Sequence, residues 1–175
     1  MNPAVQKLHI VPDMLPRFSQ VFQKGIRVEI ETGCTLESLL YDQWGLPTEY
    51  VLEKISTLFL NGKPVDDIST ARIGEGAVLA LSSAMPGLVG AVMRRDGFFS
   101  SLRGTITYRE EAQADSVRRG LITVKLFNLL IGELGPRFLT RGFFIDPGDL
   151  PDDLAQGLDK GYVGGVGIFV VDDLN

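Results

Sequence analysis

A two-residue turn signal, Asn61-Gly62, lies between two short apolar runs in the stretch STLFLNGKPVDD and constrains the fold more than any other feature of the chain. A type I′ hairpin turn needs two residues that tolerate positive φ, and Asn followed by Gly is a favoured pair for it. We therefore expect a tight antiparallel hairpin at this point, with positive φ at both residues.

The stretch KGIRVEIETG, upstream of the hairpin, alternates apolar and charged residues. Ile26, Val28 and Ile30 fall on one face, and the residues between them are charged. This period of two is typical of a strand with one buried face. The run IGEGAVLALSS predicts a turn followed by a buried strand. KLHIVPDML predicts one more strand, in which Pro12 limits hydrogen bonding to one side.

A helix is expected between the first strand and the hairpin. Thr35 can cap it, because its hydroxyl can accept a hydrogen bond from a free backbone N–H of the first turn. Gly45 and Pro47 predict its end. Its apolar residues recur with helical spacing, at Leu36, Leu39, Leu40 and Trp44. About four or five strands and one main helix up to residue 83 predict an α+β sheet with the helix across one face, the ubiquitin-like β-grasp arrangement.

Residues 7–93 resemble the MoaD/ThiS family of β-grasp sulfur carriers. The resemblance rests on VEIETGCTLESLL, LFLNGKPVDD, IGEGAVLAL and the small-residue tail SSAMPGLVGA, in this order. It implies a chemistry in which a partner enzyme adenylates a C-terminal glycine carboxylate, which then takes up sulfur. If carrier function persists, the implied partner is an adenylyltransferase-like or cofactor-biosynthesis enzyme.

The tail departs from the family pattern. Family tails end in paired glycines, whereas this stretch lacks such a pair and the sequence continues to Asn175. We therefore expect that the intact chain carries no sulfur and needs no cofactor, and that it is a non-enzymatic protein-interaction module. The candidate partner-binding residues are Met85, Pro86, Gly87, Leu88, Val89 and Gly90. Since the tail is apolar, we expect an ordered, partly buried connector over residues 84–93.

Two other functions stay open at this point. Proteolysis after Gly87 or Gly90 would create a sulfur carrier for molybdenum- or tungsten-cofactor or thiamine biosynthesis. Alternatively, a small-ligand sensor or an enzyme would use the junction between the two halves of the chain. The sulfur carrier needs a free glycine carboxylate, and the sensor or enzyme needs a ligand pocket. The interaction module needs neither.

The division of the chain follows from the resemblance. We expect a β-grasp domain over residues 1–93 and a second small α+β domain over residues 94–175. In the second half, ITVKLFNLLIGELG looks like the opening strand and turn of the same family, and TRGFFIDPGDLPDDLA aligns with GIRVEIETGCTLESLL. The second half is therefore interpreted as an incomplete β-grasp-like repeat. TITY would supply one more strand, and an open sheet edge would favour association, including homo-oligomers.

An alternative stays open for part of this second half. Residues 116–134 also fit a buried helix that is apolar nearly all round, although the alternation of Ile122, Val124 and Leu126 with polar residues favours a strand.

Composition and charge limit the partners and the cellular location that we expect. The formal net charge is −5, which argues against nucleic acid as the partner. Cys34 is the only cysteine, so we expect a reducing, cytoplasmic location. The N-terminus lacks the apolar core of a signal peptide, and the longest uncharged run, residues 77–93, is too short and too interrupted for a spanning helix. A membrane is not expected as a partner.

Several residues that could carry chemistry have plainer interpretations. His9 is the only histidine, so no multi-histidine metal site is expected. Cys34 precedes a helix, where a thiol pKa can fall, but a small residue in a turn is the favoured interpretation. GYVGGVG precedes a strand and not a helix, so it is interpreted as a turn. The acids of DPGDLPDDL lack the spacing of a calcium loop and are placed at a helix N-terminus instead.

Overall fold

The computed structural model describes residues 5–9, 12–83, 91–95, 97, 116–145, 147–152 and 167–171. The strands are β1 (Val5–His9), β2 (Ile26–Thr32), β3 (Thr57–Leu60), β4 (Lys63–Pro64), β5 (Val78–Ser82), β6 (Arg118–Phe127), β7 (Phe144–Ile145) and β8 (Gly167–Val171). The α-helices are α1 (Ser19–Lys24), α2 (Leu36–Ser38), α3 (Thr48–Lys54) and α5 (Leu129–Arg141). The other helical segments are the 3-10 helices η1 (Pro12–Phe18) and η4 (Pro147–Asp149) and the π-helix η2 (Leu39–Gln43).

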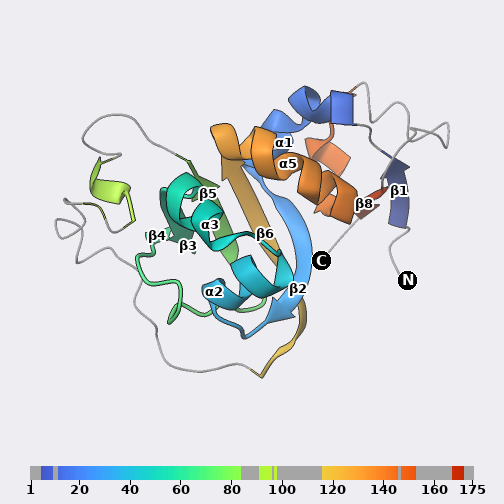
Figure 1. Ribbon diagram of the computed structural model, residues 1–175. Helices are drawn as coiled ribbons and strands as arrows, with labels where there is room; N and C mark the ends of the chain where they lie inside the picture. Colours follow the sequence, from blue (N-terminus) through green and yellow to red (C-terminus); the bar gives the residue numbers. More distant parts are fainter. Residues whose placement is uncertain are drawn as a thin grey trace.

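The described strands form one mixed sheet of eight strands, in the order β1-β8-β7-β2-β6-β5-β3-β4 (Figure 1). β6 lies near its middle, antiparallel to β2 and parallel to β5. Strands from both predicted domains, 1–93 and 94–175, therefore belong to the same sheet. The prediction that residues 7–83 complete a sheet by themselves is wrong, because β2 and β5 pair with β6 and not with each other.

The strand predicted from KLHIVPDML is confirmed only in its first part, because β1 ends at His9 and Pro12 begins the 3-10 helix η1. Its position in the sheet was not foreseen. β1 pairs antiparallel with β8, so that Val5 lies opposite Val171. β8 in turn runs parallel to β7, which joins this outer part of the sheet to β2. Among the described strands β1 has no second neighbour. Pro12 begins η1 and lies outside β1, so the limit on hydrogen bonding expected from it does not apply to this strand.

One face of the sheet carries the core. The alternation predicted for β2 is confirmed, because Ile26, Val28 and Ile30 are buried while Glu29 and Glu31 are exposed. β6 adds three side chains that are almost completely buried: Ile122, Val124 and Leu126. Figure 1 shows α2, α3 and α5 over one face of the sheet. Buried residues of β2, β6 and these three helices belong to a single hydrophobic cluster, so the two halves of the chain share one core.

The helix after β2 begins as predicted. Thr35 Oγ1 accepts a hydrogen bond from the Ser38 N–H at 3.2 Å, and Leu36, Leu39 and Leu40 are fully buried. Its second part is wider than an α-helix, since the Trp44 N–H donates to the Leu39 carbonyl five residues earlier. The segment therefore continues the apolar face of α2 through the π-helix η2.

The predicted hairpin is confirmed. Asn61 has φ 50° and Gly62 has φ 78°, and Leu60 pairs with Lys63 across the two-residue turn. The Asn61 side chain also accepts a hydrogen bond from the Val78 N–H at 2.9 Å. The turn thus fixes the β3–β4 hairpin and ties it to the start of β5.

A substitution at Gly62 should lower the free energy of unfolding. Gly62→Val should destabilise the protein by about 1–2 kcal/mol, because a residue with a Cβ fits poorly at positive φ and a β-branched residue is stiffer still. The free energy of unfolding, measured by urea denaturation, checks this.

Gly132, inside α5, provides the matched control. A Cβ at either glycine meets nothing within 4 Å, but only Gly62 has a positive φ. Gly132→Ala should therefore stabilise the protein by up to about 1 kcal/mol. Equal destabilisation by both substitutions would contradict the backbone explanation.

The second half is a mixed strand-and-helix segment. The strand interpretation of ITVKLF is confirmed as part of β6, and the helix begins only at Leu129, in α5. Pairing of this segment with β2 and β5 leaves it as part of the common α+β sheet, and a repeat is not confirmed. TITY lies outside the described residues, as do Gly164 and Gly165. No helix within the described ranges is long and apolar enough to cross a membrane.

Candidate functional site

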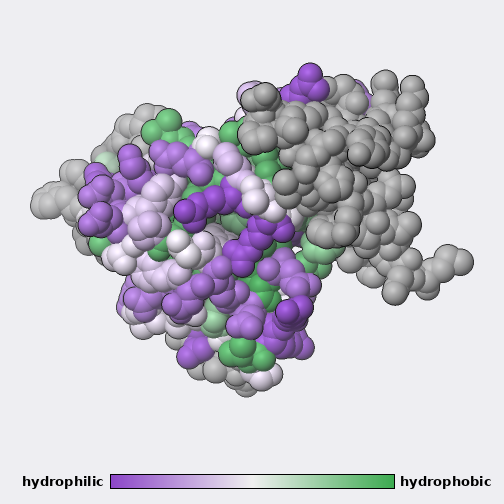
Figure 2. All heavy atoms as spheres, turned by 45° about the vertical axis from the view of Figure 1, so that its right-hand side comes forward, coloured by the Kyte–Doolittle hydropathy of each residue, from purple (hydrophilic) through white to green (hydrophobic). Residues whose placement is uncertain are grey.

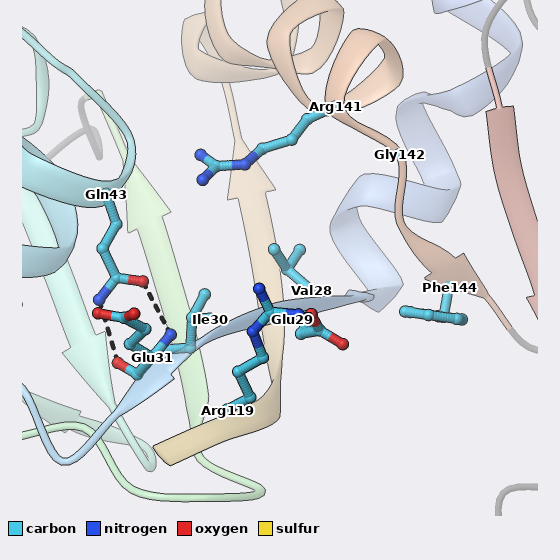
Figure 3. Close-up of a pocket in the computed structure, with 9 residues that line it drawn as sticks. All are labelled: Val28, Glu29, Ile30, Glu31, Gln43, Arg119, Arg141, Gly142 and Phe144. Carbon is cyan, nitrogen blue, oxygen red and sulfur yellow. Dashed lines mark hydrogen bonds and ion pairs between the residues drawn. The ribbon is translucent and has the colours of Figure 1, made fainter. Parts of the chain in front are cut away.

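An open groove of about 510 Å³ lies along the edge of β2 that faces away from β6 (Figure 3). β7 covers only the beginning of this edge, since it has two residues and pairs with β2 only at Arg27, opposite Phe144. Because this pairing is antiparallel, only the residues before Phe144 could cover β2 further toward Glu31, and α5 ends just before them at Arg141. The groove is lined by Val28, Glu29, Ile30, Glu31, Gln43, Arg119, Arg141, Gly142 and Phe144.

The backbone of Glu29 faces this groove. In an extended strand, successive residues direct their N–H and C=O groups to opposite sides. The Glu31 N–H and C=O point away from β6, since both bond to the Gln43 side chain. The same alternation directs the N–H and C=O of Glu29 to that side. Within the described residues, neither group has a hydrogen-bond partner.

Gln43 closes one end of the groove. Its Oε1 accepts a hydrogen bond from the Glu31 N–H at 2.9 Å, and its Nε2 donates to the Glu31 carbonyl at 3.0 Å. The side-chain amide thus occupies the position that a peptide group of a neighbouring strand would take. Figure 3 shows both bonds at the end of β2 that lies away from Phe144.

Cys34 contacts both Gln43 and the Glu31 carbonyl. Its Sγ donates to the Glu31 carbonyl at 3.1 Å and accepts from Gln43 Nε2 at 3.2 Å. Burial raises the pKa of the Cys34 thiol. A raised pKa leaves less thiolate at neutral pH, so the small-residue interpretation of Cys34 is the better one.

Two arginines reach the groove from opposite faces of the sheet. Arg119, on β6, makes a 3.5 Å ion pair with Glu29 on the exposed face, and both side chains are open to solvent. Arg141, the last residue of α5, extends over the groove from the helix-covered face (Figure 3). Among the described residues Arg141 has no hydrogen-bond or ion-pair partner. In the part of the chain that the structure describes, the groove therefore offers a cation without a partner beside a strand edge that no neighbouring strand covers.

The chain geometry after α5 places Arg141. Gly142 has φ 87°, and its N–H donates to the Phe138 carbonyl at 2.8 Å. A residue with this φ lets the chain leave the helix and drop directly into β7. Arg141 is thereby held at the rim of the groove, one turn after the buried Phe138.

Charged and polar side chains make up much of the groove lining. Figure 2 shows a face on which hydrophilic side chains predominate and apolar ones are scattered. The exposed large apolar side chains within the described ranges are Leu52, Val117 and Leu129. In the same ranges no group of three or more potential metal ligands occurs. What the groove can do is hydrogen-bond an extended backbone and attract an anion.

The predicted partner-binding residues cannot be placed. Met85, Pro86, Gly87, Leu88, Val89 and Gly90 lie outside the described residues, so the ordered connector stays a prediction there. Just beyond them, Arg95 is anchored on the folded body. Its N–H donates to the Ser56 carbonyl and its guanidinium to the Val51 carbonyl, both at 2.8 Å.

Other residues considered from the sequence have structural roles or lie outside the description. Asp149, in η4, makes a 3.0 Å ion pair with Lys24. His9 lies in strand β1, as expected. Asp146 and Asp153 lie outside the described residues.

Sequence reasoning missed the groove itself. Glu29 and Glu31 were assigned only to a polar strand face, and no sequence signal singles out Gln43 or Arg141.

Comparison with known proteins adds no further assignment. No protein-family model, no curated protein and no solved structure matches this chain. The function is therefore argued from the groove and the sheet alone.

Proposed function

We propose that this protein is a non-enzymatic interaction module of β-grasp type, related to the sulfur carriers, and that it binds an extended segment of a partner protein at the open edge of β2. The observation that carries the proposal is the backbone of Glu29, whose N–H and C=O face the groove without a partner among the described residues. An extended peptide satisfies such groups by adding a strand, which is a common mode of peptide recognition.

The strand order supports the β-grasp part of the proposal. In a ubiquitin-like sheet, the first and last strands run parallel in the middle, with hairpin strands on either side. The order β2-β6-β5-β3-β4 has this form if β6 takes the place of the first strand. The resemblance of ITVKLF to the opening strand of the carrier family agrees with that assignment. The β-grasp would then be completed by a strand from the second half.

The size of the opening supports a short contact. One end is closed by Phe144 opposite Arg27, and the other by Gln43 on Glu31. Only Glu29 is left between them with backbone groups directed outward. A partner segment therefore makes about two backbone hydrogen bonds, each worth about 0.5–1.5 kcal/mol, and depends on side chains for the rest of its affinity.

A peptide-display selection on the full chain tests the proposal. We expect binders whose affinity is lost in Glu29→Pro, because proline has no N–H to donate. The thermal midpoint of the variant must be measured, since proline also restricts φ. N-methylation of the peptide residue that pairs with Glu29 gives a second test that leaves the protein unchanged. Binders that are indifferent to both changes, or no binders at all, would refute strand addition at this edge.

A further inference from the structure

We infer that the partner segment carries an aspartate or glutamate side chain that binds Arg141, at a position next to the residue that pairs with Glu29. This inference rests on the proposed function, because it specifies the segment that adds to β2. The inference follows from the charges on the two faces of the groove, since Arg141 lies on one face and the carboxylates of Glu29 and Glu31 lie on the other.

The face of the groove under α5 offers the cation. Val28 and Ile30 point toward this face, where their side chains are buried, and the Arg141 guanidinium extends over the same side (Figure 3). Arg141 is exposed and has no partner within the described residues. A carboxylate that arrives on this side would gain a charge-assisted hydrogen bond without breaking one that Arg141 makes to any described residue.

The opposite face of the groove carries more carboxylates than arginines. Arg119 contacts Glu29 there at 3.5 Å. The Glu31 carboxylate belongs to the same face, because residues 29 and 31 alternate with buried neighbours. An acid placed on this face would stand beside two carboxylates, and like charges across neighbouring strands are destabilising.

Strand geometry predicts which residue of the partner segment carries the acid. Directly paired residues of neighbouring strands direct their side chains to the same face, and successive residues alternate. The peptide residue opposite Glu29 therefore lies on the face with the carboxylates, and its two neighbours lie on the face with Arg141. An acid is favoured at one of those neighbours and disfavoured at the paired residue itself.

The same peptide selection provides the material for the test. The peptides are amidated at the C-terminus, so that any selected carboxylate belongs to a side chain, and free-acid versions form a separate arm. We expect an Asp or Glu one residue away from the paired position. Its replacement by Asn or Gln should weaken binding about fivefold, within the range of exposed ion pairs.

Arg141→Gln should produce the same loss for the acidic peptide and almost none for its neutral version. Arg119→Gln is the matched control, since it makes the same change in the same groove on the other face. The loss caused by Arg141→Gln should also shrink at high salt, because salt screens exposed charges.

The outcomes separate the two proposals. If peptides bind in a manner that depends on the Glu29 N–H but show no preference for an acid, or if Arg119→Gln matches Arg141→Gln, this inference is overturned while strand addition stands. If the preferred acid is the residue opposite Glu29, the assignment of the acid to the Arg141 face is wrong. If no selected peptide depends on Glu29, both proposals fail.

Discussion

A fragment of residues 1–93 should fail to fold on its own. It contains β2 and β5 but lacks β6, the strand that separates them and bonds to both. The missing strand buries Ile122, Val124 and Leu126, each at most 1% exposed. Burial of such side chains stabilises by about 1.5–3 kcal/mol each. Their loss alone approaches the ~5–15 kcal/mol by which whole domains are stable.

Circular dichroism and amide NMR dispersion check this expectation. Fragment 1–93 should show poor dispersion, and the addition of fragment 94–175 should restore the spectrum of the intact chain. A well-dispersed spectrum from 1–93 alone would show instead that the boundary at residue 93 divides two independent folding units, and that β2 and β5 can pair without β6.

Leu39→Ala should lower the free energy of unfolding by about 2–5 kcal/mol. Leu39 is completely buried, at the point where α2 continues into η2, and it packs in the cluster shared by both halves. Truncation removes buried methyl groups and leaves a cavity that the surrounding sheet and helices can fill only in part. Urea denaturation of the intact chain, with the slope checked for two-state behaviour, gives the difference.

Leu52→Ala is the control for this truncation. Leu52 lies on α3 and is 64% exposed, so its replacement should change stability by less than about 0.5 kcal/mol. A cost below about 0.5 kcal/mol for Leu39→Ala would mean that the helix after β2 does not pack as described. A large cost for Leu52→Ala would instead indicate that α3 is covered in solution.

Features that depend on neighbouring residues could be predicted from the sequence. Positive φ at Asn61 and Gly62 follows from the turn chemistry of two residues, and the Thr35 cap follows from one hydroxyl and one free N–H. The buried face of β2 follows from its alternation. Each of these is decided within a few residues, so the chain segment itself contains the information.

The choice of strand neighbours could not be predicted in the same way. β2 would pair equally well, by its pattern alone, with any strand that offers a complementary apolar face. That β6 takes this place depends on the packing of α5 and α1 against the same core, and the two strands are far apart in the sequence. The expectation of a sheet closed within residues 7–83 failed for this reason.

The candidate site depends on the same non-local choices. The edge of β2 is open because β7 begins only at Phe144, opposite Arg27, and because Gln43 occupies only the far end. Arg141 reaches the groove because α5 ends above it and Gly142 turns the chain. None of these residues belongs to a motif, so only the assembled sheet brings them together.

The pairing of β1 with β8 has a consequence for how the chain could be reconnected. Val5 lies opposite Val171, so a short linker could join β8 to β1 without disturbing the sheet. If new ends were then opened between Ser83 and Ser116, the permuted chain would begin with β6 and finish with β5. Residues 84–90 could follow β5 as a free tail. In that rearranged order, the permuted polypeptide would present Gly87 and Gly90 near a terminus.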